Sequence, residues 1–366
     1  MKTKNEQVAG IRAGGCGAGG SRISRRAFVR GAALAATLGL AGCGAYDNSG
    51  ATGGSDTSAK SGKDSVTKLT FCLDYTPNTN HTGVYVAQQK GYFADEGLEV
   101  EIVQPAEDTA EAMIGSGEAQ LGVSYQDYIA NVLASDSPAP VVAVAAIIQH
   151  NTSGIMSRKA DGITSARGMC DHVYATWDMP IEQATIKQIV EDDGGDYSKV
   201  KMVPYSVDDE VAGLRGDMFD TVWVYEGWAV QNAVLQGYDV NYFNFRDMDD
   251  VFDFYTPVIA ANGDYAQQNP DVVKAFLRAV RRGYEDAIKD PEASADLLCA
   301  AVPEMDAALA KQSALFLAGQ YQADAPTWGV IDADRWARYF LWLNEKGLVE
   351  KQLDTGAGWT MDYLEQ

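Results

Sequence analysis

The stretch Asp74-Tyr75-Thr76-Pro77-Asn78-Thr79-Asn80-His81 decides the fold, because it joins a predicted strand to a predicted helix. Before it, residues 69–73 alternate between large apolar and smaller side chains, which is the period-two pattern of a strand. After it, we expect Asn80 to cap a short helix that ends near Gly91. A second alternating run over residues 98–102 predicts another strand. Strand, loop, helix and strand together indicate a βαβ unit with parallel strands.

The octapeptide itself is a candidate binding loop. In open α/β sheets, ligands bind beyond the carboxyl ends of the strands, and this loop lies at such an end. Its candidate ligand-binding residues are Asp74, Tyr75, Asn78 and His81, although His81 can equally serve only to brace the loop. Composition alone fits an ordinary turn just as well, because Pro and Asn are common turn residues.

Residues 73–86, followed by residues 91–100, resemble the signature of the SsuA/THI5-like (NMT1-type) periplasmic binding proteins. The resemblance is greatest to the ThiY branch, which captures a formylated aminopyrimidine for thiamine salvage. Weaker similarity extends over residues 67–345. The resemblance implies an α/β, two-lobed periplasmic-binding-protein-like fold of type II, in which each lobe is a sheet flanked by helices and the ligand cleft lies between the lobes.

The same resemblance implies a function in transport. The chain would be a substrate-binding component of an ABC importer that needs no cofactor, works as a monomer and is not an enzyme. It would deliver a pyrimidine ligand to a permease and its ATPase. Lobe 1 is expected at residues 67–152 plus 257–366 and lobe 2 at residues 153–256, so that two crossover segments form the hinge.

Composition and charge limit the partners of the chain. At 366 residues with 46% hydrophobic side chains, it has enough apolar material for a globular core and a length typical of two domains. The formal charge is −22, and residues 1–42 carry seven Lys/Arg and one Glu, so the remainder carries −28. Such an acidic body argues against nucleic-acid binding. An anionic ligand stays open, since a local pocket can differ from the whole surface.

Residues 1–43 are predicted to be a twin-arginine-type lipoprotein signal peptide. Ser24-Arg25-Arg26-Ala27-Phe28 has the twin-arginine pattern, and the apolar run 32–41 fits a signal h-region but is too short for a membrane span of about 20 residues. Leu40-Ala41-Gly42-Cys43 resembles a lipobox, which implies lipidation of Cys43 and an extracytoplasmic protein anchored to the outer face of the cell membrane. Residues 44–66 have the composition of a flexible linker.

The remaining cysteines and the histidines predict no metal or redox centre. Cys72, Cys170 and Cys299 have no zinc or redox spacing, and we expect them to be small buried residues, with one bridge among them left open. The three histidines are widely spaced, so no metal site is expected. His150 is expected near the hinge or on the surface.

Two further strand ends carry aromatic candidates. Tyr125 follows a short predicted strand and is a candidate to stack on a ligand, unless it only caps the core. Trp177 follows a predicted strand over residues 172–176 and is a second candidate, with packing between the lobes or in the core as the alternative. Pro180 starts the next helix, whose N–H groups are available to a ligand oxygen, and Glu182 in its first turn joins the candidate set.

The run Phe219–Trp228 contains the last two candidates. Residues 221–224 read as a buried strand, and Tyr225 and Glu226 lie at its end. A buried carboxylate needs a partner, and a 4-aminopyrimidine offers an amine donor to Glu226. In ThiY-like proteins the matching stretch reads Trp-Glu-Gly, so Glu226 carries over while Tyr225 replaces the Trp. The alternative is a helix-start Glu in a salt bridge.

The sequence leaves three alternatives to a pyrimidine-binding protein. Binding proteins for alkanesulfonate, riboflavin or another small ligand belong to the same class, although anions favour Arg or Ser in the cleft. A THI5-type pyrimidine synthase carries a Cys-rich iron motif, whereas this chain has no Cys or His between His172 and Cys299. A purely structural lipoprotein would not require the polar loop at a strand end.

Overall fold

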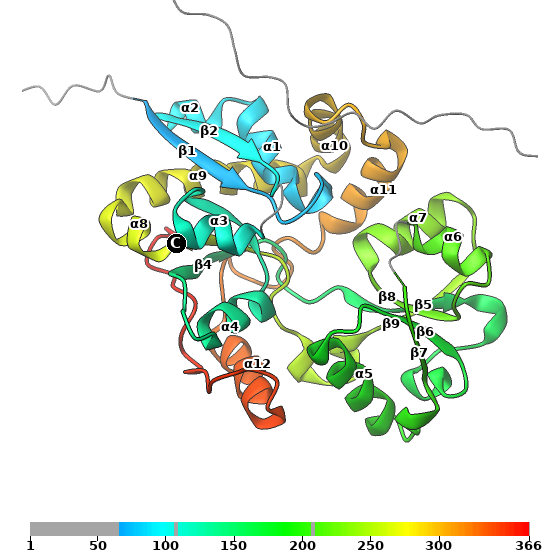
Figure 1. Cartoon of the computed structure of the whole chain (residues 1–366). Coiled ribbons are helices and arrows are strands. Elements are labelled where there is room, and N and C mark those ends of the chain that lie inside the picture. The colour runs from blue at the N-terminus through cyan, green and yellow to red at the C-terminus, as the bar shows by residue number, and fades with distance from the viewer. Residues whose placement is uncertain (1–65, 106–108, 206–208, 366) are drawn as a thin grey trace, which may run out of the picture. The chain divides into compact units, whose positions relative to one another are not determined.

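The computed structural model describes residues 66–105, 109–205 and 209–365. It contains two five-stranded sheets, ordered β2-β1-β3-β10-β4 and β7-β6-β8-β5-β9, each flanked by helices (Figure 1). The strands are β1 Thr67–Cys72, β2 Leu98–Val103, β3 Leu121–Ser124, β4 Val141–Ala146, β5 Ser153–Arg158, β6 Val173–Thr176, β7 Lys201–Pro204, β8 Thr221–Tyr225, β9 Val240–Asn244 and β10 Val258–Asn262. The predicted α/β fold class is confirmed.

The helices pack on the faces of these sheets. The α-helices are α1 Thr82–Gln89, α2 Tyr92–Asp95, α3 Ala110–Ser116, α4 Gln126–Ala134, α5 Pro180–Asp192, α6 Glu210–Arg215, α7 Gln231–Leu235, α8 Gly263–Gln268, α9 Pro270–Lys289, α10 Pro291–Ala301, α11 Ala307–Leu317 and α12 Ala333–Lys346. Short 3-10 turns are η1 Thr79–His81, η2 Lys159–Asp161, η3 Ala166–Met169, η4 Tyr197–Lys199, η6 Phe245–Asp247 and η7 Asp250–Phe252, and η5 Glu226–Val230 is a π-helix. Within the described ranges, no helix has the length and apolarity needed to cross a membrane.

The first sheet contains the predicted βαβ unit. Strands β1 and β2 pair in parallel, with Thr67 opposite Leu98. Strand β10, which the chain reaches only after completing the second sheet, lies antiparallel between β3 and β4. The segments that join the sheets are residues 147–152 and 245–257, and the proposed lobe boundaries fall within or at the end of these segments.

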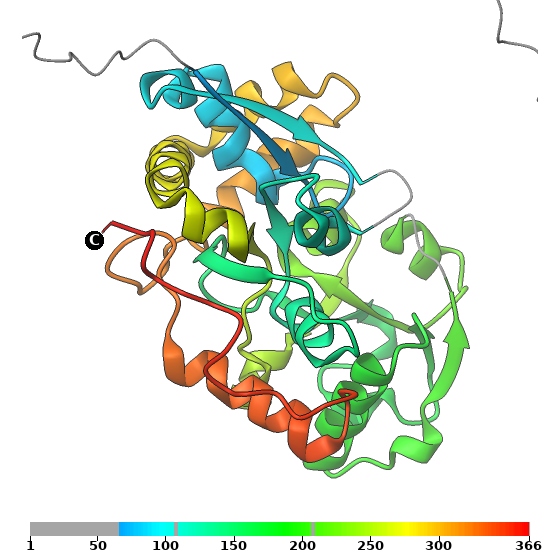
Figure 2. The same ribbon diagram turned by 60° about the vertical axis from the view of Figure 1, so that its left-hand side comes forward.

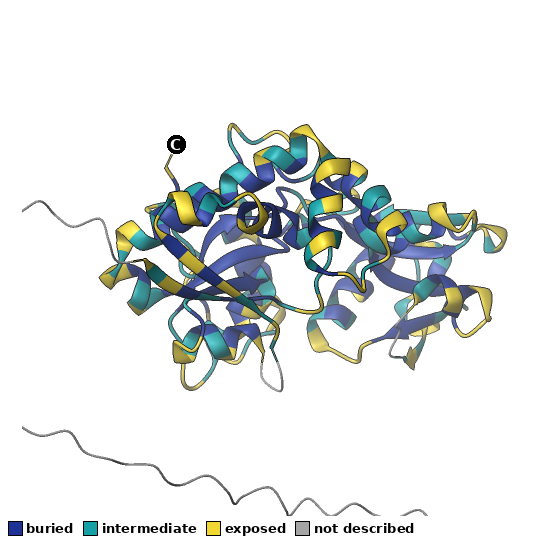
Figure 3. Ribbon diagram, turned by 90° about the horizontal axis from the view of Figure 1, so that it is seen from above, coloured by how far each residue is buried: buried dark blue, intermediate teal, exposed yellow. Residues whose placement is uncertain are grey.

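Close packing fixes α1, the helix that follows the octapeptide, on the first sheet. Gly83 of α1 faces Gly283 of α9, and a Cβ atom at Gly283 would overlap the carbonyl of Gly83. A Cβ atom at Gly83 would in turn overlap the ring of Tyr284. Glycine at these two positions therefore lets α1 pack closely on α9, which holds the octapeptide at its strand end. Figure 3 shows the central strands of both sheets as buried, whereas the edge strands β2, β7 and β9 and the outer faces of the helices carry exposed or half-buried positions.

The C-terminal part of the chain returns to the first sheet. In Figure 2 the last segment, drawn in red, runs back along α12. It passes β4, where Trp359 bridges to Ala143, and ends at Glu365 against Arg278 and Arg281 of α9. The three cysteines in the described part are all free thiols, so the disulfide that the sequence allowed among them is not formed. Cys72 is buried as predicted, whereas Cys170 and Cys299 are only half-buried.

His150 connects the two crossover segments. Its Nδ1 lies 2.7 Å from Asp253 in the return crossover, and its Nε2 lies 2.8 Å from Asp324. Arg335 also approaches Asp253, at 3.4 Å. Hydrogen bonding to Asp253, followed by that to Asp324, outweighs burial and raises the pKa of His150. His150 therefore links the two crossover segments and the loop at Asp324 through hydrogen bonds from both ring nitrogens.

The stability of the protein should depend on pH through His150. A raised folded-state pKa gives stability that is fully present below the unfolded value near 6.5 and is lost as pH rises through the folded value. We expect His150→Gln to lower the free energy of unfolding by about 1 kcal/mol at pH 6, a modest loss because Asp324 is exposed and its ion pair is weak. At pH 8.5 the loss should be smaller, because less of His150 carries the charge. Urea denaturation at both pH values measures this. Lys68→Gln, which removes an exposed ion pair, is the control and should show no such slope. A pH-independent effect at His150 would contradict the prediction.

The predicted twin-arginine segment, the lipobox with Cys43 and the linker over residues 44–66 fall almost wholly outside the described residues, which begin at Val66. Those predictions therefore remain predictions.

Candidate functional site

A cavity of about 670 Å³ lies between segments of the two lobes. Its walls come from the octapeptide and the start of α4 on one side, and from the ends of β6 and β8 with η5 on the other. The lining residues are Asp74, Tyr75, Thr76, Pro77, Asn78, Thr79, Asn80, Tyr125, Ile148, Thr152, Trp177, Glu210, Val222, Trp223, Val224, Tyr225, Gly227, Trp228, Ala229 and Leu317. Six of the nine residues predicted to bind ligand thus share one cavity: Asp74, Tyr75, Asn78, Tyr125, Trp177 and Tyr225.

Asp74 is the polar centre of the first wall. One carboxylate oxygen lies 2.6 Å from Nε2 of His81, and the other accepts a hydrogen bond from the hydroxyl of Tyr125. The backbone N–H of Asn78 donates to Nδ1 of His81 at 3.1 Å. Because Nδ1 accepts, Nε2 carries the proton and donates it to Asp74. His81 is fully buried and lies outside the cavity lining, so it braces the loop; its contact with a ligand remains a prediction.

This network keeps Asp74 ionised. Burial acts to raise the pKa of Asp74, but the interaction with His81 and the hydrogen bonds from His81 and Tyr125 outweigh it and lower the pKa. Burial, then the charge of Asp74, raises the pKa of Tyr125 well above its usual range, so the phenol keeps its proton and donates. The first wall therefore presents a fixed negative charge to the cavity.

Asn78 builds the loop as well as lining the cavity. Its side chain accepts from the backbone N–H of Asn80 at 2.9 Å and donates to the carbonyl of Thr76 at 3.1 Å. The predicted N-cap at Asn80 is therefore wrong: Asn78 caps η1, and α1 starts at Thr82. The reason is that a 3-10 turn precedes the helix, which moves the capping position two residues earlier.

The second wall is aromatic. Trp177 lies 5.5 Å from Trp223 between ring centroids, and Trp223 packs edge-on against Phe245 at 4.3 Å. Tyr225 stands at the end of β8, and its hydroxyl lies 3.4 Å from that of Thr256. Trp177 keeps 46% of its surface exposed, so it can still pack against a ligand.

Glu182 supports this wall without lining the cavity. Buried in the first turn of α5, it accepts hydrogen bonds from the Tyr174 hydroxyl at 2.7 Å, the Thr176 hydroxyl at 2.9 Å and the backbone N–H of Trp177 at 3.0 Å. These bonds fix the turn that presents Trp177. Both carboxylate oxygens of Glu182 thus already accept hydrogen bonds from the protein. Contact between Glu182 and a ligand remains a prediction.

Glu226 also lies outside the cavity lining, although its neighbours Tyr225 and Gly227 are part of it. Burial raises the pKa of Glu226, with Arg246 opposing and Asp247 reinforcing the shift. Its surroundings thus include the charged residues of η6. The π-helical turn η5 points Gly227 and Trp228 into the cavity instead, and ligand contact by Glu226 remains a prediction.

Sequence reasoning missed several lining residues. Thr79 is one of several polar residues of the loop with no signal of its own, and Trp223 lies inside a strand that reads as buried. Leu317 lies in a C-terminal helix with no local sign of a cavity. Among the described lining residues there is no Lys, Arg or His, and the two carboxylates are Asp74 and Glu210. In the part of the chain that the structure describes, no three His, Cys, Asp or Glu residues gather closely enough to hold a metal ion.

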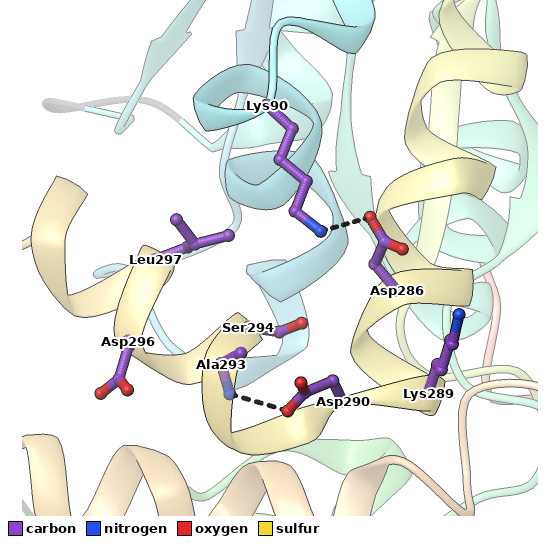
Figure 4. A pocket seen from close by; sticks show the side chains of 8 residues that line it. All are labelled: Lys90, Asp286, Lys289, Asp290, Ala293, Ser294, Asp296 and Leu297. Atoms are coloured by element: carbon purple, nitrogen blue, oxygen red, sulfur yellow. Dashed lines mark hydrogen bonds and ion pairs between the residues drawn. The ribbon is translucent and has the colours of Figure 1, made fainter.

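A second hollow, of about 400 Å³, lies among α1, α9 and α10 (Figure 4). Lys90 points toward Asp286 and pairs with it at 2.8 Å, and Asp290 caps α10 by accepting from the N–H of Ala293. These polar groups satisfy one another, and no strand end reaches the hollow. We therefore place the candidate site in the larger cavity.

Tyr125→Phe should test the network around Asp74. The variant removes the donor to a buried carboxylate, so we expect the free energy of unfolding at pH 7 to fall by about 1.5–3 kcal/mol. The lowered pKa of Asp74 gives stability that is present above the unfolded value near 3.9 and is lost as pH falls through the folded value, so the difference should shrink below about pH 4. Urea denaturation at pH 7 and pH 3.5 measures both. Tyr128→Phe is the control, since Tyr128 is exposed; equal losses in the two variants would refute a special role for Tyr125.

Comparison with known proteins gives the family. The chain is 27% identical over 302 residues to the formylaminopyrimidine-binding protein of Halalkalibacterium halodurans, covering 81% of this chain and 90% of that protein. It is 26% identical over 239 residues to a 4-amino-5-hydroxymethyl-2-methylpyrimidine phosphate synthase of Saccharomyces cerevisiae, covering 62% of this chain and 69% of the synthase.

A similar solved structure is the periplasmic aliphatic sulphonate binding protein SsuA from Escherichia coli, with a TM-score of 0.63 at 16% identity, covering 79% of this chain and 96% of that one. At this identity the likeness establishes the fold alone. The family model described as NMT1/THI5 like matches residues 78–294, and the chain belongs to the NMT1/THI5-like family.

Proposed function

We propose that the chain is the extracytoplasmic substrate-binding component of an ABC importer. It would capture a thiamine-precursor pyrimidine of the formylaminopyrimidine or hydroxymethylpyrimidine type and deliver it to a permease and its ATPase. The observation that carries the proposal is the ionised Asp74 at the wall of an aromatic cavity whose described lining has no cation. The formylaminopyrimidine-binding relative supports it.

The cavity suits a flat, amine-bearing ring. Its volume falls within the range of about 300–1,000 Å³ that small-molecule sites occupy. The exocyclic amine of a 4-aminopyrimidine would donate to a free lone pair of Asp74, and a protonated ring nitrogen would add a charged hydrogen bond. Tyr75, Trp177 and Tyr225 would pack on the ring faces, each such contact being worth roughly 0.5–1.5 kcal/mol beyond burial.

Charge disfavours the alkanesulfonate alternative. A sulfonate keeps its negative charge at all physiological pH values and needs donors or a cation in its site. Here it would face the carboxylate of Asp74, and like charges in a partly buried site repel. The fold likeness to sulfonate-binding proteins does not weigh against this, because one fold hosts many ligands.

We also propose that the chain is not a pyrimidine synthase. The yeast synthases are relatives, but this chain has no Cys or His between His172 and Cys299 to match an iron motif. In keeping with transport, we propose that the chain acts as a monomer, is exported through its twin-arginine segment and is anchored by lipid on Cys43.

A thermal-shift panel tests the ligand class. We expect formylaminopyrimidine and hydroxymethylpyrimidine to raise the melting temperature of the protein, while alkanesulfonates, riboflavin and thiamine raise it less or not at all. A ligand at 100 times its dissociation constant adds about 2.7 kcal/mol to the stability of the native state. A shift with sulfonates and none with pyrimidines would eliminate the pyrimidine proposal.

Asp74→Asn tests the charge that carries the proposal. The substitution keeps the size of the side chain but removes the anion, so we expect affinity for formylaminopyrimidine to fall at least about ten-fold by calorimetry, or about 1.4 kcal/mol. Asp136→Asn changes an exposed carboxylate at the far end of α4 and is the matched control. Affinity in Asp74→Asn equal to that of the control would remove Asp74 from the site.

A further inference from the structure

Helix α11 contacts cavity-lining segments of both lobes at one residue, Ser313. Its hydroxyl donates a hydrogen bond to the carbonyl oxygen of Gly227 in η5. The same hydroxyl oxygen lies 2.6 Å from Oγ1 of Thr79 in η1. Ser313 is fully buried and is not among the lining residues, whereas Thr79 and Gly227 both are.

The direction of these bonds follows from chemistry. A carbonyl oxygen can only accept, so the single hydroxyl proton of Ser313 goes to Gly227. Thr79 must then donate to the Ser313 oxygen. On its other side, the carbonyl of Thr79 accepts from the hydroxyl of Tyr321 at 2.7 Å. One directed chain thus runs from the octapeptide of lobe 1, through α11, to the π-helical turn of lobe 2.

Packing around the chain is tight. A Cβ atom at Gly227 would lie 2.8 Å from Cδ2 of Leu317, so the backbone of η5 packs directly on the side chains of α11 at this glycine. Gln312, next to Ser313 in sequence, donates to Gln231 of α7 at 3.0 Å. Figure 1 shows α11 beside α7. The contact is therefore a surface of several residues with Ser313 at its buried centre.

The cavity is closed on this side and open on another. Thr79 is buried, while Tyr75 and Trp177 keep 67% and 46% of their surfaces exposed. A ligand would therefore enter past these two aromatic side chains. The walls that meet at Ser313 are already joined before it arrives.

We propose that Ser313 is a positioning residue that ties the two walls of the cavity together in the ligand-free protein. The proposal rests on the proposed binding function. If only a fraction of molecules has the walls correctly placed, the apparent affinity is reduced by that fraction, so a tie that raises the fraction raises affinity. Ser313 does so without touching the ligand.

Ser313→Ala in the full-length chain tests the tie, since Ala retains the helix and removes only the hydroxyl. In the ligand-free variant, we expect amide hydrogen exchange to become at least about three-fold faster in peptides covering residues 79–81 and 226–230, with little change in the rest of α11. Affinity for formylaminopyrimidine should fall about three- to ten-fold. Ser313→Cys keeps a weaker hydrogen-bond donor, so its exchange rates and its affinity should lie between those of Ser313→Ala and those of the original protein.

Ser294→Ala is the matched control, because it removes another buried hydroxyl, from the neighbouring helix α10, whose main contacts are with α1, α9 and α11. It should match the original protein in exchange and affinity. Unchanged exchange at both segments in Ser313→Ala would overturn the tie, as would faster exchange with unchanged affinity. Absence of formylaminopyrimidine binding by the unsubstituted protein would refute the proposed function instead, and the ligand-free exchange would still decide the tie.

Discussion

The site depends on a carboxylate that stays charged although it is buried. Removing an ion from water costs several kcal/mol, and the protein offsets this by giving Asp74 two donors from its own lobe. His81 donates because Asn78 holds its other nitrogen, and Tyr125 donates because burial keeps its proton in place. The charge therefore does not require a ligand in order to exist, and a ligand that donates gains an acceptor already in position.

This arrangement explains why the octapeptide has its particular polar sequence. Asp74 begins the loop two residues after the end of β1, and Asn78 turns the backbone so that His81 reaches back seven residues to Asp74. The crossing of α1 and α9 at two glycines then holds the loop against the sheet. The strand end, the cap at Asn78 and the hydrogen bonds from His81 and Tyr125 thus all fix the position of the Asp74 carboxylate.

Local sequence patterns correctly predicted strand ends and helix starts, because these depend on residues that are close in sequence. The alternating run before the loop gave β1, the proline at residue 180 marked the start of α5, and the strand end at Tyr225 was correct. Glu182 and Glu226 were ambiguous, because a glutamate at a helix start looks the same whether it holds a ligand or the backbone. Only the three-dimensional donors around Glu182 reveal the second role.

Contacts between distant segments could not be predicted. Ser313 stands 234 residues from Thr79 and 86 from Gly227, inside a helix whose sequence shows only an ordinary apolar face. The cavity likewise draws Leu317 and Trp223 from segments that read as core. A discontinuous lobe makes such contacts possible, because the chain leaves the first sheet, builds the second and returns through β10. The late helices can then pack against both earlier parts. Recognition groups near strand ends are therefore visible in the sequence, whereas the contacts that hold the two walls together arise only when the chain has closed on itself.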